Sequence, residues 1–295
     1  MLMAASWPIS ANSLRESKPL EHLALKIYSK GGILLTACAP ERVSAVYCAA
    51  YRPGDMISLE IGETNRFCVV QFEDTMPPAL VYVKQQRIVF PVPVSDKPEP
   101  IPYSPKSFAG SCHIIRARFA TPEEISTRRN LAFNPYDHMF YGQGPMGDGK
   151  DTGFYPHASS NIEPTSPGFA PRTAIDGVLE NGAHLMWPYQ AWSNDRDPSA
   201  ELTIDFGRAV CIDELRLTLR ADYPHDSWWT EGTALFSDGS SKTVALEKTA
   251  LPQVFSITPR TVTSLTLCNL KKHEDVSLYT ALTQIEVWGT ETEIK

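Results

Sequence analysis

The chain is poor in the features that mark a membrane span or a nucleic-acid surface. No apolar run in its 295 residues approaches the roughly 20 residues that a helix needs to cross a bilayer. Asp and Glu outnumber Lys and Arg by 34 to 27, the formal net charge is −7, and the basic residues form no cluster. Because phosphate groups and anionic bilayers both attract concentrated positive charge, we expect neither a nucleic-acid partner nor a membrane partner.

Signs of secretion are also scarce. Residues 1–12 have neither a basic start nor a clear apolar core, so the sequence predicts no signal peptide. The 6 cysteines form no CxxC pair and lie in or beside apolar stretches. We therefore expect buried free thiols in a reducing, cytoplasmic compartment. The even number of cysteines leaves an extracellular protein with disulfides as the alternative.

Common catalytic motifs are missing as well. The chain contains no GxSxG and no HExxH, and His184, His225 and His273 are too scattered for a predicted zinc site. Asp222 and Asp226 could form the carboxylate pair of a glycoside hydrolase. Adjacent residues such as His225 and Asp226, however, point apart on an extended segment. The sequence therefore favours a protein without catalytic activity, with a polysaccharide-active lyase or hydrolase as the weaker alternative.

What the sequence does contain is the pattern of many short β-strands. Hydrophobic residues make up 42% of the chain and charged residues 21%, with 24 prolines against 17 glycines, which suits a globular protein with frequent turns. Residues 23–27 and 57–61 alternate between apolar and polar, and residues 67–72 and 80–83 are short apolar runs. Residues 19–120 are therefore predicted to form an N-terminal β-sandwich of unknown role.

One helix is predicted between the two halves of the chain. Thr121 is a natural N-cap, Pro122 suits the first helical position, and Glu124 completes a capping box. We expect the helix to run to about residue 131, before Asn134 and Pro135 stop it. Residues 121–152 then form a connector. Its glycine-rich end, 141–151, is predicted to be a loop and lacks the Lys-Ser/Thr pair of a phosphate-binding loop.

The second half, residues 153–292, again reads as β structure. Residues 202–206 and 215–219 alternate strictly between apolar and polar, which puts one face on a core and the other toward solvent. Asp238 and Gly239 supply the backbone geometry of a hairpin turn. Short strands at this spacing indicate a sandwich or jelly roll.

Several segments of this half together resemble the discoidin-type, galactose-binding-like domains of coagulation factors and bacterial carbohydrate-binding modules. In the order of that family, they are 174–177 (AIDG), 187–192 (WPYQAW), 200–207 (AELTIDFG), 212–219 and 283–289 (TQIEVWG). The resemblance covers less than half of the chain. The predicted fold is therefore all-β, with two β-sandwich or jelly-roll domains joined by a short helix, the second of them galactose-binding-like.

Two carboxylates of these motifs are candidate metal ligands. Glu286 lies between Ile285 and Val287 in an apolar strand, so it faces away from them and needs a partner. In many members of the family the residues that match Asp176 and Glu286 bind a structural Ca²⁺, an ion that prefers oxygen ligands. The resemblance thus implies a calcium site at Asp176 and Glu286, with hydrogen bonding to loop amides or exposure to solvent as the alternatives.

The predicted loops of the second half are rich in aromatic and charged residues. A sugar offers an apolar ring face and many hydroxyls, so a good site combines aromatic rings with charged or amide groups. The candidate ligand-binding residues are His157, Trp187, Arg220, Asp222, His225, Asp226 and Trp228. We expect Trp192 and Trp229 to pack in the core, and Arg220 has the alternative of pairing with one of the nearby aspartates.

The sequence thus supports three functional hypotheses. The first is a non-catalytic protein that recognises a carbohydrate ligand through these loops. The second is an interaction or scaffold protein, in which exposed aromatic side chains dock a protein partner or a second copy of the chain as a homo-oligomer. The third is the lyase or hydrolase named above, with its site between the two domains.

Overall fold

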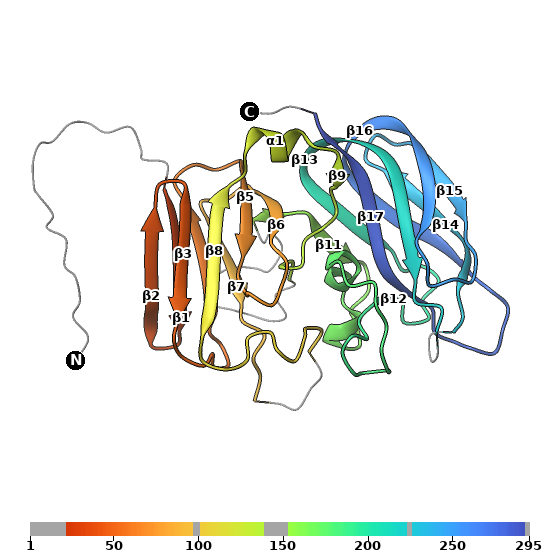
Figure 1. The fold of residues 1–295 in the computed structure, drawn as a ribbon. Helices are drawn as coiled ribbons and strands as arrows, with labels where there is room; N and C mark the ends of the chain where they lie inside the picture. The colour runs from red at the N-terminus through yellow and green to blue at the C-terminus, as the bar shows by residue number, and fades with distance from the viewer. Residues whose placement is uncertain (1–21, 97–100, 139–152, 223–225, 293–295) are drawn as a thin grey trace, which may run out of the picture.

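The structure consists of two β-sandwiches that lie side by side (Figure 1). It is a computed structural model, and it describes residues 22–96, 101–138, 153–222 and 226–292. Three antiparallel sheets and one short α-helix account for most of the described residues, which confirms the all-β prediction. None of the helices in the described ranges is long and apolar enough to span a membrane.

The N-terminal sandwich packs a 4-stranded sheet, β2-β1-β4-β7, against a 5-stranded sheet, β10-β6-β5-β8-β3. Its strands are β1 (Leu23–Ser29), β2 (Gly32–Ala39), β3 (Arg42–Tyr47), β4 (Met56–Ile61), β5 (Arg66–Gln71), β6 (Ala79–Val83), β7 (Arg87–Pro91) and β8 (His113–Phe119). Alternate residues of these strands, such as Leu23, Leu25 and Ile27 of β1, are fully buried between the two sheets. The strands predicted at 23–27, 57–61, 67–72 and 80–83 are all present.

The C-terminal sandwich is a single 8-stranded sheet that folds over its own core. Its main strands are β11 (His157–Ser160), β12 (Trp192–Ser193), β13 (Leu202–Leu219), β14 (Trp229–Phe236), β15 (Ser241–Ala245), β16 (Gln253–Lys272) and β17 (Ala281–Glu291). Two 3-10 helices, η1 (Pro167–Phe169) and η2 (Pro171–Ile175), precede β12. The pairing of β13 with β16 shifts between Asp205 and Val210, where both long strands bend and the sheet turns over.

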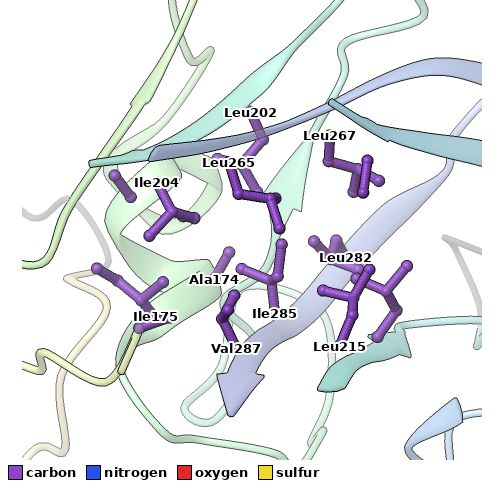
Figure 2. Packing of buried hydrophobic residues seen from close by; sticks show 14 of the residues in the cluster. Ala174, Ile175, Leu202, Ile204, Leu215, Leu265, Leu267, Leu282, Ile285 and Val287 are labelled. Atoms are coloured by element: carbon purple, nitrogen blue, oxygen red, sulfur yellow. The ribbon is translucent and has the colours of Figure 1, made fainter. Parts of the chain in front are cut away.

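The core of the C-terminal sandwich joins η2 to the strands around it. Figure 2 shows Ala174 and Ile175 of η2 facing Ile204, Leu265 and Ile285 from three strands. Trp192 and Trp229 are both 1% exposed, with ring centroids 6.0 Å apart, so the prediction that they belong to the core is confirmed. The alternation predicted at 202–206 and 215–219 is confirmed too, because the apolar members of both runs are buried.

The connector begins with the predicted helix, α1 (Pro122–Ser126). The capping box is present, since Glu124 N–H donates to the Thr121 hydroxyl and Thr121 N–H donates to the Glu124 carboxylate. The helix is nevertheless shorter than predicted. The Thr127 hydroxyl donates to the Glu123 carbonyl at 2.7 Å, and the chain then leaves the helix to pair as a strand.

The chain crosses between the two sandwiches more than once. Strand β9 (Arg129–Asn130) pairs with β17 of the C-terminal sheet. Strand β10 (Phe154–Tyr155), which follows it in sequence, pairs with β6 of the N-terminal sheet. Strand β9, which follows the N-terminal sandwich in sequence, thus belongs to the C-terminal sheet, and β10, which precedes the C-terminal sandwich, belongs to the N-terminal sheet. This exchange of strands connects the two sandwiches. The whole glycine-rich segment 141–151 lies outside the described residues.

The cysteines are free, but the prediction that they are all buried is wrong. Cys68 and Cys268 are buried, Cys211 is partly buried, and Cys38, Cys48 and Cys112 are exposed. Cys38 lies on an outward-facing position of the edge strand β2. The other two exposed cysteines directly follow β3 and precede β8, where the sheet ends and the side chains are no longer covered.

Candidate ligand-binding site

Three loops of the C-terminal sandwich meet at one end of the barrel-like sheet, which we call the mouth. The described parts of these loops are residues 194–201, 220–222 with 226–228, and 273–280. Arg220 N–H donates to the Ala281 carbonyl and His273 N–H donates to the Trp228 carbonyl, both at 2.9 Å. The Thr280 hydroxyl donates to Asn194 Oδ1 at 3.0 Å, which fastens the third loop. The mouth is therefore a connected surface and not a set of separate loops.

Trp228 forms an aromatic platform on this surface. Its ring stacks on the His273 imidazole, with centroids 3.8 Å apart and an angle of 19° between the planes. The Lys248 ammonium lies 5.2 Å from the Trp228 ring centroid. Trp228 is partly buried against the core, and the His273 side chain keeps 40% of its surface exposed. The pair thus offers a flat aromatic surface that solvent can reach.

Asp275 places a carboxylate beside this platform. Lys272 Nζ lies 2.9 Å from one of its oxygens, the Ser227 hydroxyl donates to the other at 3.0 Å, and His273 Nδ1 lies 3.3 Å from that same oxygen. The hydrogen bond from Lys272, followed by those from Ser227 and His273, lowers the pKa of Asp275 to about 2. The carboxylate is therefore ionised at neutral pH and available as a hydrogen-bond acceptor.

Arg220 supports the mouth from below instead of facing a ligand. Its side chain is 0% exposed, Nε donates to Asp222 Oδ1 at 2.8 Å, and Nη1 donates to the Tyr189 carbonyl. The pairing with a nearby aspartate, which the sequence left as the alternative, is thus present. Arg220 thus ties the start of the loop after β13 to the segment before β12.

The other predicted ligand-binding residues do not all join this group. Asp222 and Asp226 lie in the same loop as Trp228 and are partly exposed, whereas His225 lies outside the described residues. His157 lies in β11 at the junction of the sandwiches, with Nδ1 at 2.7 Å from Asp137 Oδ1 and 18% of its side chain exposed. Trp187 lines a cavity at that junction together with residues of the N-terminal sandwich.

The two predicted calcium ligands have hydrogen-bond partners of their own. Asp176 accepts from Val178 N–H at 2.9 Å and from Gln284 Nε2 at 2.7 Å, and its burial raises its pKa to about 6. Glu286 accepts from Trp288 Nε1 at 2.7 Å. The described residues hold no group of three or more His, Cys, Asp or Glu suited to a metal. Calcium binding at Asp176 and Glu286 therefore stays a prediction.

The sequence missed the residues that complete the mouth. His273, Asp275 and Lys248 come from the loop after β16 and the segment after β15, far along the chain from Trp228. Only the strand order shows which loops share an end of the sandwich, and sequence periodicity alone does not supply that order. An aromatic-rich loop could be recognised in isolation, but its partners could not.

Comparisons with known solved structures find matches over about half of the chain. No family model and no curated protein matches the chain. Among solved structures, a chitosan-binding module from a chitosanase/glucanase of Paenibacillus sp. IK-5 matches at 18% identity and a TM-score of 0.36, covering 55% of this chain and 99% of the module. A fucose-binding module of Streptococcus pneumoniae, SpX-3, matches at 12% identity and a TM-score of 0.37, covering 55% and 99%.

A third match is the family 32 carbohydrate-binding module of C. perfringens NanJ, solved with galactose. It is 16% identical, has a TM-score of 0.34 and covers 44% of this chain and 91% of the module. About half of the chain is thus similar to galactose-binding-like carbohydrate-binding modules. At these identities the likeness concerns the fold of about half the chain, and not the ligand or the residues that bind it.

Proposed function

We propose that the protein binds a carbohydrate, without chemical conversion, at the mouth of its C-terminal sandwich. The observation that carries the proposal is the partly exposed ring pair of Trp228 and His273 beside the ionised Asp275. A pyranose ring stacks its apolar face on such a surface, and its hydroxyls exchange hydrogen bonds with charged side chains at the rim. Asp226, on the same loop as Trp228, and Lys248, on the segment after β15, supply further charged groups.

Binding assays with paired variants test this proposal. Purified protein is screened on a glycan array that includes chitosan, fucose and galactose, and the best ligand is titrated by calorimetry. We expect Trp228→Ala and His273→Ala each to raise the dissociation constant about tenfold or more, because each removes part of the stacking surface. Trp288→Ala is the matched control, since Trp288 lies on β17 at the end away from the mouth and contacts Glu286. Unchanged affinity in both mouth variants would remove this site.

Release of reducing sugar addresses the catalytic alternative. Incubation of the protein with the polysaccharides that it binds, followed by a reducing-end assay, separates recognition from hydrolysis. A lyase would be seen by the absorbance of the unsaturated product. Turnover in either assay, lost in Asp222→Asn or Asp226→Asn, would replace the binding proposal by an enzymatic one.

Self-association is the second candidate function. Strands β2 and β3 lie at the edges of the two N-terminal sheets, and Ile33, Leu34 and Val46 on them are 58%, 47% and 54% exposed. Edge strands with outward apolar side chains pair readily with a second copy of the same chain. We expect a dimer in light scattering after size exclusion, and a monomer for Leu34→Lys. A monomeric wild-type chain would count against this candidate.

A further inference from the structure

A cavity of about 190 Å³ lies between the two sandwiches, away from the mouth. The N-terminal sandwich supplies residues 75–77 and 102–104 with Ser107, and the C-terminal half supplies Arg172, Asp176 and Trp187. The N-terminal wall is held in place, because Phe108 N–H donates to Glu73 Oε2 at 3.0 Å and the Thr75 and Ser107 hydroxyls lie 2.7 Å apart. Hydrogen bonds within the N-terminal sandwich therefore fix this wall of the cavity.

Arg172 lines this cavity and holds one buried hydrogen-bond donor without a partner among the described residues. The residue is 5% exposed, and its guanidinium is fixed by bonds from Nε to the Asp137 carbonyl at 2.7 Å and from Nη2 to the Pro135 carbonyl at 3.0 Å. Its carbon Cζ also lies 4.6 Å from the Tyr103 ring centroid. The remaining nitrogen, Nη1, is buried and has no hydrogen-bond partner in the described part of the chain. A buried donor of this kind is costly to leave unpaired, so a ligand acceptor that reached it would be bound favourably.

Asp176 faces the same cavity with spare capacity as an acceptor. Its Oδ1 atom accepts the bonds from Val178 and Gln284, whereas the contact of Oδ2 with Gln190 Nε2 is long, at 3.5 Å. The carboxylate is 5% exposed. A ligand that fits must therefore accept a hydrogen bond from Arg172 and donate one to Asp176.

The rest of the cavity wall is mainly apolar. Trp187 and Tyr103 present aromatic rings, and Met76, Pro77 and Pro102 complete the surface. A hydroxyl group both donates and accepts, so vicinal hydroxyls on a ring satisfy Arg172 and Asp176 together while the ring face packs on the aromatic side chains. The opposite charges of these two residues disfavour a ligand with a net charge. The volume is below the roughly 300–1,000 Å³ typical of sites for drug-sized ligands, so it suits one ring and not a chain.

We infer that this cavity is a second binding site, which takes a single neutral sugar ring between the two sandwiches. It shares no residue with the mouth, so the two sites can be tested separately. A ring bound here contacts both sandwiches and therefore stabilises their junction.

The test uses the full chain and a panel of methyl glycosides of galactose, glucose, fucose and N-acetylglucosamine, with benzoate as an apolar anionic probe. Binding is measured by calorimetry and by saturation-transfer NMR. Wild type is compared with Trp187→Ala, which removes an aromatic wall, and Ser104→Phe, which fills the cavity from a partly exposed position. Trp228→Ala is the matched control at the mouth. Thermal melting verifies that each variant is folded.

We expect at least one glycoside to bind wild type and Trp228→Ala alike, and to bind about tenfold more weakly to both cavity variants. Three results would overturn the inference: no glycoside binds, the cavity variants bind as wild type does, or benzoate binds while the sugars do not. Loss of binding only in Trp228→Ala would likewise overturn it and would support the mouth alone. If the mouth proposal is wrong, Trp228→Ala will bind the glycan array as strongly as the wild type does.

Discussion

Two buried arginines show how differently the same side chain can be used. Arg220 and Arg172 both donate to backbone carbonyls, but only Arg220 also forms an ion pair, with Asp222. Sequence reasoning could place Arg220 in an aromatic, charged loop but could not tell that it lies below the surface. Burial of a long polar side chain depends on which backbone carbonyls the fold brings within its reach. For Arg220 this carbonyl belongs to Tyr189, which is far away in sequence.

Arg220→Ala should destabilise the protein. The change leaves the Tyr189 carbonyl and Asp222 without their partner and opens a gap in a fully buried position, so we expect a loss of about 2–3 kcal/mol in the free energy of unfolding. Arg216→Ala is the control, because Arg216 makes a comparable bond to Glu214 but is 31% exposed, and such pairs contribute about 0–1 kcal/mol. Urea denaturation measures both. Equal losses would contradict a supporting role for Arg220.

His138 should make the stability depend on pH. Burial lowers its pKa from 6.5 to about 4, against the raising effect of Asp137 and with small lowering effects of His157 and Arg172. The folded protein thus keeps His138 neutral where the unfolded chain takes up a proton. The stability that the neutral His138 contributes is fully present above pH 6.5. It is lost as the pH falls toward 4, and the loss in the free energy of unfolding is at most about 3 kcal/mol.

Asp176 changes the stability of the protein in the opposite direction over the same pH range. Its pKa is raised to about 6, so its contribution is present below pH 3.8 and is lost as the pH rises through 6. The wild-type profile should therefore be nearly flat between pH 4 and 6.5. In His138→Phe, where Phe90 and Phe154 offer an aromatic environment, stability should instead rise on acidification. Urea denaturation across this range would refute the assignment if both proteins gave parallel profiles.

At the scale of elements, the closing strand β17 explains a glycine that the sequence showed only as part of a motif. A Cβ atom on Gly289 would lie 2.1 Å from the Cys211 carbonyl oxygen, on the backbone of the neighbouring strand β13. The register of β13 and β17 shifts next to this contact, between Ile212 and Glu214. The glycine therefore allows the two strands to approach closely where β13 is irregular.

Gly289→Ala should separate these strands. Because the obstructing atoms belong to the backbone and cannot rotate away, we expect a loss of more than about 2 kcal/mol in unfolding free energy. Gly31→Ala serves as the control, since the nearest atom to its added Cβ, on Ser29, is 3.6 Å away, and it should change stability by less than about 1 kcal/mol. Chemical denaturation of the two variants checks the contrast. A tolerated Gly289→Ala would mean that the strands are not so closely paired.

The elements themselves were predictable where local signals sufficed. The capping box placed the start of α1 at Thr121, but the end of the helix was set by pairing of Arg129 and Asn130 with β17, a contact that is distant in sequence. Residues 254–257 and 262–267, which are two separate apolar runs in the sequence, are parts of one strand, β16. Register shifts within its pairing with β13 interrupt the alternation, so periodicity reads one bent strand as two.

At the scale of the whole molecule, the two sandwiches share their boundary. Besides the exchanged strands β9 and β10, Arg208 of β13 bonds to Glu291 at 2.6 and 2.8 Å and lies 4.9 Å from the Phe67 ring and 5.1 Å from the Tyr82 ring of the N-terminal sheet. A linear division into domains could be drawn from composition and turn signals. The exchange of strands β9 and β10 could not be predicted from the sequence, because strands of two residues carry no periodic pattern.

This shared boundary should make the protein unfold as one unit. Separate domains often melt independently, but here each sandwich would lose a strand if the other opened. The two halves carry separate probes: the described tryptophans all lie between residues 187 and 288, whereas Cys68 is buried in the N-terminal core, with its pKa raised to about 12 by burial. Tryptophan fluorescence and alkylation of Cys68, followed by mass spectrometry, should therefore give the same urea midpoint. Arg208→Ala should lower both midpoints together, because its contacts join the two sheets. Midpoints that differ in the wild type would show that the exchanged strands do not couple the sandwiches, and a change confined to the tryptophan signal would assign Arg208 to the C-terminal sandwich alone.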